Sequence, residues 1–285
     1  MVNEQVKEKY IKIFLYVVAS FSVLVLFAIM FFITIKGMGM ITVEFLTTTP
    51  YRFEYGGIFP QIIGTLYLVG VCMGFAGPIG ILAGMYLSEY APVNIVTRIL
   101  RFFVESLAGV PSIVIGLFGL AFLVYYMHFQ ISLLSGGLAL GFMILPWTVR
   151  TSEEAIRAVP FSYREASLAL GASKWQTIKQ VVVKAATPGI ITGLLLGLGK
   201  AIGETAVVLL TAGSGLESFL PRSIFEPVAS LPVYLYMIAT QGHTSEAYNR
   251  AYGAALVLLG IFLAINIFAS LVRNHYLKKH SVRFG

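Results

Sequence analysis

The sequence predicts an all-α membrane protein with six transmembrane helices, and three observations support this fold class. Of the 285 residues, 58% are hydrophobic and 12% are charged, whereas soluble domains have roughly 25% charged residues. The mean hydropathy is +0.84. Uncharged stretches recur along the chain, and several reach the roughly 20 residues that a helix needs to cross a bilayer. These values argue against a water-soluble fold.

The uncharged stretches define the expected spans. Residues 13–35 carry no charge and form too long an apolar run for a cleaved signal peptide, so we expect this span to be retained. Residues 106–149 would measure about 66 Å as one helix, about twice the bilayer core, so the chain must turn back near 127–137. Pro78 is expected to kink the second span. The predicted spans are 13–35, 62–87, 102–126, 131–149, 186–211 and 251–272.

Positive charges predict the orientation of the chain. Of the 20 Lys and Arg residues, 15 fall on the side of the N-terminus, four fall on the other side, and Lys200 lies within a span. Cytoplasmic loops retain positive charge, so both termini are expected in the cytoplasm. The basic residues separate apolar blocks instead of forming one patch, which argues against nucleic-acid binding despite a net charge of +7.

Few residues could support metal or catalytic chemistry. Cys72 is the only cysteine, so neither a disulfide framework nor a thiol pair is expected. The four histidines show no ligand-like spacing. We therefore expect no metal site, no cofactor and no catalytic residues on this chain.

Two outer segments, 37–60 and 213–250, are expected to contain short helices that do not cross the membrane. The clearest piece is LPVYLYMIA at 231–239, opened by Pro232. Its length favours a re-entrant or interfacial helix. No low-complexity linker divides the chain, so one domain is expected over residues 1–285.

The inner loop at about 151–187 is the longest cytoplasmic segment. Ser162 and Glu165 form a capping-box pattern that predicts a helix, and Gly171 can end this helix in the left-handed conformation. Ser173 and Gln176 repeat the capping-box pattern, and the second helix is expected to stop before Pro188. The sequence thus predicts a helix, a glycine corner and a second helix.

Such a corner below the membrane suits docking into a groove of a partner protein. The alternative is an amphipathic pair of helices that lies on the lipid surface. A capped corner favours docking, because surface anchors present a continuous apolar stripe. The expected apolar anchors are Leu168, Leu170, Trp175 and Ile178.

The stretch EASLALGASKWQTIKQVV at 165–182 resembles the EAA loop of ABC importer permeases. One departure is Val183–Lys184, where the family usually has Leu-Pro. The resemblance implies a type I ABC importer permease that docks on a cytosolic ATPase. ATP would then be hydrolysed by that separate subunit, and this chain would not be an enzyme. The docking residues implied are Glu165, Ala166, Ser167, Leu168, Gly171, Ala172 and Trp175.

Charged residues within the fifth predicted span are a second functional signal. Lys200 lies 12 residues beyond Pro188, about 18 Å into a core about 30 Å thick. Glu204 follows at i+4, so the two are expected to form an ion pair on one helix face. Lys200 either offsets the charge of an anionic substrate, with Glu204 holding it between turnovers, or the pair only fixes helix packing against a partner subunit.

The segment GKAIGETA at 199–206 resembles the R-A-x-G-E-T signature of phosphate importer permeases, with Lys200 in place of Arg. Sulfate and molybdate relatives usually have Phe at the position of Thr205. The stretches GMYLSEYA at 84–91 and ESLAGVPSIVIGLF at 105–118 resemble the PstA branch of this family. Glu105 itself is expected to pair with Arg101 at the lipid interface rather than to line the inner mouth of the pathway.

The resemblance implies a subunit of a phosphate importer in the prokaryotic cytoplasmic (inner) membrane, in which this chain forms half of the pathway. Lys200, Glu204 and Thr205 would line that pathway. The implied partners are a PstC-like permease subunit, a PstB-like ATPase dimer, a PstS-like binding protein and membrane lipid. Two alternatives stay open: a permease for sulfate or molybdate, and a secondary transporter, whose inverted repeats are not visible here.

Overall fold

The computed structural model describes residues 2–51, 55–216 and 219–281, which are mainly helical. The elements, in chain order, are α1 (Val2–Met38), α2 (Val43–Thr47), β1 (Pro50–Tyr51), β2 (Tyr55–Gly56), α3 (Phe59–Glu89), α4 (Ile95–Ala108), α5 (Ser112–Gly119), the π-helix η1 (Leu120–Tyr126), α6 (Leu133–Arg157), α7 (Phe161–Ala169), α8 (Lys174–Thr177), the π-helix η2 (Ile178–Val182), α9 (Val183–Ile202), α10 (Ala206–Thr211), α11 (Leu231–Gln241) and α12 (Ser245–Ser281). The two strands form a short antiparallel ladder.

Five helical segments of the described chain are long and apolar enough to cross a membrane. They are Lys7–Met38, Phe59–Glu89, Leu133–Arg157, Lys174–Ile202 and Ser245–Asn274. Each contains most or all of a predicted span, although the observed ends differ from the predicted ones. A sixth crossing requires that the bent pair formed by α4 and α5–η1 counts as one span.

The third predicted span, 102–126, is wrong as a single helix. α4 ends at Ala108, and the next helix starts at Ser112 after a bend of 100°. Pro111 precedes the second helix and Gly109 ends the first. Proline disfavours a helical conformation in the residue before it, which explains why the helix breaks here.

The fifth predicted span, 186–211, also differs from the structure at both ends. The helix begins at Lys174, runs through η2 and past Pro188, and ends at Ile202. The predicted stop before Pro188 is therefore wrong. Proline is tolerated in membrane helices because neighbouring helices and local π-type adjustments satisfy the freed backbone groups. The inner loop is shorter than predicted, because α6 also continues to Arg157.

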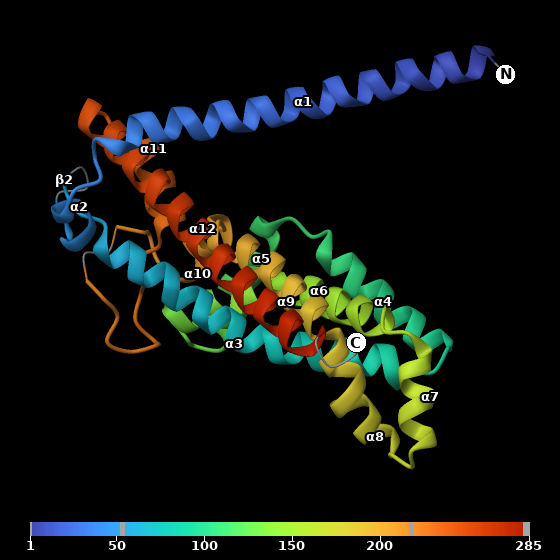
Figure 1. The fold of residues 1–285 in the computed structure, drawn as a ribbon. Coiled ribbons are helices and arrows are strands. Elements are labelled where there is room, and N and C mark those ends of the chain that lie inside the picture. The colour runs from blue at the N-terminus through green and yellow to red at the C-terminus, as the bar shows by residue number, and fades with distance from the viewer. Residues whose placement is uncertain (1, 52–54, 217–218, 282–285) are drawn as a thin grey trace.

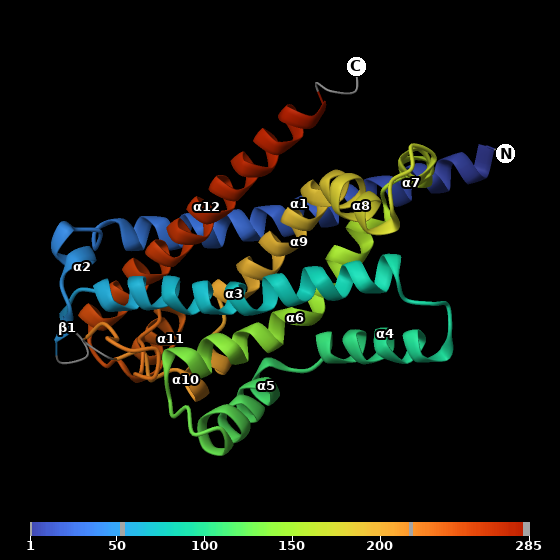
Figure 2. The same cartoon turned by 90° about the horizontal axis from the view of Figure 1, so that it is seen from below.

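The long helices α3, α6 and α9 pack against one another (Figures 1 and 2). The contact between α3 and α6 depends on small residues. A Cβ atom at Gly80 would overlap the side chain of Thr148, and one at Gly84 would lie 2.7 Å from the Cβ of Ser152. Glycine at these positions lets two membrane helices approach closely. α3 and α6 are therefore a tightly packed pair.

α1 leaves the body of the protein, as Figure 1 shows. The most apolar 18-residue window of its membrane-spanning part has no buried residue. Its C-terminal part contacts α12, where the rings of Phe32 and Tyr252 pack edge to face at 5.6 Å. Most of this helix is therefore not covered by the rest of the chain.

The short apolar piece at 231–239 forms α11, which is too short to cross a membrane. Ser230 caps it by accepting a hydrogen bond from the Val233 amide at 3.4 Å. Leu231, Tyr234 and Ile238 are buried. α11 therefore packs one face and its N-terminal part into the protein, whereas Tyr236 and residues 239–241 are exposed.

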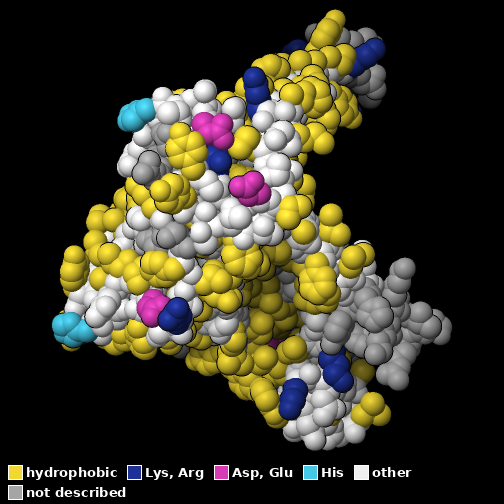
Figure 3. Space-filling model, turned by 90° about the vertical axis from the view of Figure 1, so that its left-hand side faces the viewer, with side chains coloured by type: hydrophobic (Ala, Val, Ile, Leu, Met, Phe, Trp, Pro, Cys, Tyr) yellow, Lys and Arg dark blue, Asp and Glu magenta, His cyan; other side chains and the backbone are white. Residues whose placement is uncertain are grey.

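The molecule has two distinct ends. The N-terminal end of α1, the C-terminal end of α12 and the pair α7–α8 lie toward one end, and α2 with the β-ladder lies at the other (Figures 1 and 2). Figure 3 views the second end, where hydrophobic side chains cover much of the face and charged side chains are few.

Candidate functional site

The corner between α7 and α8 forms as the sequence predicts. Gly171 has a φ of +83°, in the left-handed region. Its amide donates to the Leu168 carbonyl at 2.9 Å, and the Ala172 amide donates to the Ser167 carbonyl at 3.3 Å. These two bonds make a Schellman motif, which satisfies the last carbonyls of α7. The corner is therefore fixed by local backbone geometry.

The two helices of the corner begin differently. Ser173 and Gln176 form the predicted capping box, in which each side chain bonds to the backbone amide of the other residue. The predicted capping box of Ser162 and Glu165 is wrong. α7 starts two residues earlier than a Ser162 cap would place it, at Phe161 after Pro160, and has no side-chain cap. Pro160 has an extended backbone, with φ −55° and ψ 140°. It therefore separates α7 from the preceding helix and directly precedes the first residue of α7.

Most predicted docking residues lie on the outside of the corner. Glu165 and Ala166 are exposed. Leu168 and Trp175 are 48% and 51% exposed. The remaining predicted residues, with Leu170, are placed as follows: Leu170 and Gly171 are exposed, and Ser167 and Ala172 are half-buried.

One predicted anchor is wrong, because Ile178 is buried. It lies where η2 packs against the bundle, so it holds the corner instead of facing a partner. The Ser167 hydroxyl lies 2.9 Å from the Thr177 hydroxyl and ties α7 to α8.

The predicted ion pair between Lys200 and Glu204 is not present. α9 ends at Ile202, and Glu204 lies in the break before α10. Its carboxylate Oε1 accepts hydrogen bonds from the amides of Ala206 at 3.1 Å and Val207 at 3.4 Å. A carboxylate is favoured there because the first amides of a helix have no intrahelical acceptor. The i, i+4 argument fails because the helix stops between the two residues.

The ammonium of Lys200 lies instead over the indole of Trp147, with Nζ 5.0 Å from the ring centroid. Within the described part of the chain, this ammonium forms no ion pair or hydrogen bond. Trp147 belongs to α6 and is 42% exposed. Sequence reasoning missed this residue, because a tryptophan in an apolar span gives no local signal of a partner on another helix.

Thr205 occupies the position that precedes α10, where its side chain makes no capping bond. It is half-buried next to Glu204. Glu204 also lines a cavity of about 10 Å³ together with Thr65 and Ser230. The break between α9 and α10 thus places polar side chains within an otherwise apolar part of the bundle.

A second charged group joins the ends of α4 and α6. The Nε of Arg101 lies 2.9 Å from Glu153 Oε1, and Arg150 pairs with Glu105 at 3.7 Å. The predicted pair of Glu105 with Arg101 is therefore wrong, because α6 brings its own acidic residues to α4. The other pairs of this group are Arg157–Glu153 and Arg150–Glu154.

Comparison with known families gives a match over most of this fold. The family described as "Binding-protein-dependent transport system inner membrane component" matches residues 76–280. The chain belongs to this family. As a member, it is a multi-pass membrane component of a transport system, in agreement with its long apolar helices.

Three relatives are similar to this chain over most of their own length. The probable ABC transporter permease protein YqgI of Bacillus subtilis is 36% identical over 273 residues, which cover 92% of this chain and 93% of the relative. The phosphate transport system permease protein PstA of Haemophilus influenzae is 39% identical, with 87% and 86% covered. The probable PstA of Methanocaldococcus jannaschii is 38% identical, with 89% and 90% covered.

Solved transporters share the fold of this family member. The inward-facing MetNI methionine ABC transporter aligns with a TM-score of 0.62 at 20% identity, covering 77% of this chain and 95% of that chain. A bacterial ABC transporter that imports the polysaccharide alginate aligns with a TM-score of 0.58 at 17% identity, covering 76% and 78%. The architecture is therefore that of type I ABC importer permeases.

Proposed function

We propose that this chain is the permease subunit of an ATP-driven importer of inorganic phosphate, in which it forms half of the translocation pathway. The similarity to PstA proteins from two distant organisms, at 38–39% identity over nearly 90% of the chain, carries this proposal. The GKAIGET segment at 199–205 supports it, since this segment forms the break between α9 and α10.

The arrangement of Lys200 suits the passage of an anion. A cation–π contact stabilises an ammonium without using its hydrogen-bond donors. An ion pair with Glu204 would have used them, but that carboxylate is held by the α10 amides. Lys200 thus keeps its N–H groups available and its charge uncompensated, which favours a passing phosphate.

The corner of α7 and α8 is the proposed docking site for a cytosolic ATPase. The end of α7 and the start of α8, which meet at this corner, are both capped. Leu168, Leu170 and Trp175 are exposed there and could enter a groove of the partner. A dimer of PstB-like ATPases would supply the ATP hydrolysis. A PstC-like permease would form the other half of the pathway, and a PstS-like protein would deliver phosphate outside.

This docking site determines the proposed orientation. The α7–α8 corner must face the cytoplasm to reach the ATPase, and both chain ends lie toward the same end of the molecule (Figure 1). Both termini are therefore proposed to be cytoplasmic, in agreement with the excess of positive charge on that side. The whole chain would act as a single membrane domain.

Co-purification tests the proposed class of transporter. When the complex is solubilised and purified through a tag on this chain, it is expected to contain a second permease and an ATPase. Uptake in proteoliposomes that also contain the binding protein should require ATP and prefer phosphate over sulfate. A chain that purifies alone and transports without ATP would contradict the importer, and a preference for sulfate would contradict the substrate.

Replacing Trp147 by Leu is expected to lower phosphate uptake by roughly twofold to tenfold, because Lys200 loses the ring that positions it. Trp147→Phe should keep most of the activity, since a smaller ring still faces the ammonium. Phe268→Leu is the matched control, because it removes an exposed ring from α12. Equal uptake by Trp147→Leu and Phe268→Leu would show that the ring has no part in transport.

A further inference from the structure

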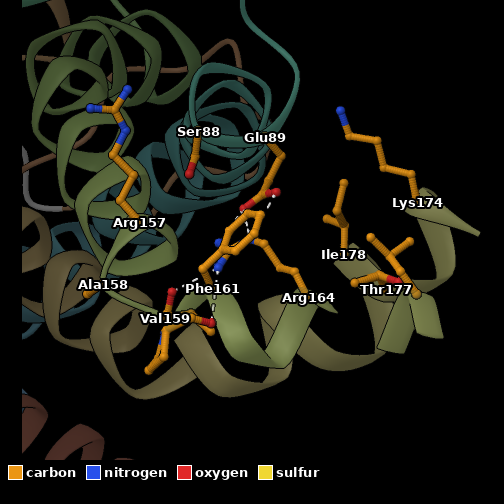
Figure 4. A pocket seen from close by; sticks show the side chains of 12 residues that line it. Ser88, Glu89, Arg157, Ala158, Val159, Phe161, Arg164, Lys174, Thr177 and Ile178 are labelled. Atoms are coloured by element: carbon orange, nitrogen blue, oxygen red, sulfur yellow. Dashed lines mark hydrogen bonds and ion pairs between the residues drawn. The ribbon is translucent and has the colours of Figure 1, made fainter. Parts of the chain in front are cut away.

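A half-buried ion pair joins the α7–α8 corner to the membrane bundle. Arg164 of α7 and Glu89 at the end of α3 face each other (Figure 4). The Nε and Nη2 atoms of Arg164 lie 3.1 and 2.5 Å from Glu89 Oε1. The side chains are only 13% and 9% exposed. A partly buried charge needs a well-placed partner, and the guanidinium of Arg164 and the carboxylate of Glu89 provide one for each other.

Arg164 also bonds to the backbone at the end of α6. Its Nη1 donates to the Val159 carbonyl at 2.8 Å, and its Nη2 donates to the Ile156 carbonyl at 3.0 Å. These carbonyls lie at and just beyond the C-terminus of a helix, where a cation is favoured. One guanidinium therefore connects α7, α6 and α3 at a single point.

A second contact joins the same end of α3 to the other helix of the corner. The Nζ of Lys174, in α8, lies 4.6 Å from the centre of the Tyr90 ring. Tyr90 directly follows Glu89, the last residue of α3, so two adjacent residues at the end of this helix contact α7 and α8. α7 also contacts α8 through the Ser167–Thr177 hydrogen bond, but none of its nine residues, all described, is buried.

The pair bounds an open cavity and not a packed core. The cavity measures about 650 Å³ and is lined by Arg157, Phe161, Thr177 and others in addition to the pair. Apolar packing between α7 and the end of α3 is therefore incomplete. The ion pair therefore supplies a direct contact between α7 and the end of α3 beside this cavity.

From these contacts we propose that Glu89 and Arg164 are positioning residues that transmit movements of the docking corner to α3. α3 packs closely on α6 through Gly80 and Gly84, and α6 carries Trp147 beside Lys200. A displacement of α7 would thus reach the proposed pathway through two rigid contacts. This role depends on the proposed docking of an ATPase at the corner.

The test is the number of ATP molecules hydrolysed per phosphate transported by the reconstituted complex. Glu89→Gln keeps the shape of the side chain but removes its charge, and it leaves the bonds of Arg164 to the α6 carbonyls. We expect the ATPase subunits to co-purify normally and the ratio to rise roughly tenfold. Arg164→Gln should act similarly, and the double variant should be no worse than the single ones, because the two residues act as one unit.

A control variant and a second measurement separate this role from a structural one. Arg157→Gln removes another arginine of the same cavity, which is 51% exposed and pairs with Glu153, and it should leave the ratio unchanged. A wild-type ratio in Glu89→Gln would overturn the proposal and leave Arg164 as a cap of α6. Loss of the ATPase from Glu89→Gln would overturn it as well, because the pair would then serve assembly.

The second measurement does not depend on the substrate. Spin labels at Leu82→Cys in α3 and Ala169→Cys in α7, both exposed positions, report the distance between the two helices. The only native cysteine, Cys72, is buried and stays in place. The distance should be the same with and without ATP in the wild-type complex and should change with ATP in Glu89→Gln. An unchanged distance in both would overturn the proposal, whereas a wild-type complex that moves no phosphate would contradict only the proposed substrate.

Discussion

Replacing Lys200 by Ala is expected to lower ATP-driven phosphate uptake by roughly a hundredfold or more, while the subunits still assemble. Lys200 lies in the last turn of α9, just before the break that leads to α10, and its ammonium lies over the Trp147 ring. Without it, phosphate would cross this part of the pathway with no opposite charge. The measurement is uptake of labelled phosphate by proteoliposomes that contain the complete complex.

The variants of Lys200 and Glu204 separate transport from packing. Lys200→Arg should keep much of the activity, because the charge stays and the guanidinium also stacks on aromatic rings. Glu204→Ala removes an acceptor for the first α10 amides, which costs about 1 kcal/mol of local stability. The double variant Lys200→Ala with Glu204→Ala should assemble and remain inactive. Near-normal uptake by this double variant would reduce both residues to a packing role.

Gly171→Val is expected to nearly abolish coupled transport while the membrane-spanning helices still insert. The left-handed φ of +83° is strongly disfavoured for a β-branched residue. A Cβ at Gly171 would meet no atom within 4 Å, so the effect comes from the backbone and not from a clash. The Schellman motif would be lost and α8 would leave α7 in a different direction. The measurement is the amount of ATPase that co-purifies, together with phosphate uptake.

Gly171→Asn is the matched control, because asparagine tolerates the left-handed conformation. It should retain most of the ATPase and most of the uptake. Gly260→Val in α12 serves as a second comparison and should retain uptake, since a Cβ there also meets no atom within 4 Å and its φ is not in the left-handed region. Normal ATPase binding and uptake by Gly171→Val would contradict the corner as the docking element.

The sequence predicted the corner correctly because its determinants are local. Gly171 specifies the left-handed residue, and the Ser173–Gln176 capping box starts the next helix within four residues. The same kind of reasoning failed for Ser162, because Pro160 had already started α7. Capping patterns compete with neighbouring residues that also start helices, and the sequence alone does not rank them.

Long-range contacts decided the parts of the site that the sequence did not predict. Ile178 is apolar and next to the corner, but η2 turns it into the bundle. Arg101 pairs with Glu153 of α6 instead of Glu105 four residues away. In both cases the partner comes from a helix distant in sequence, so spacing along one helix could not identify it.

The sequence by itself determined the class of protein, the five long apolar helices and the shape of the α7–α8 corner. These features depend on the length of apolar runs, the placement of charge and the conformations open to glycine and proline. The tertiary structure decided which groups meet Lys200. Because α9 ends at Ile202, Glu204 turns to the amides of α10, and the packing of α6 beside α9 brings Trp147 over the ammonium.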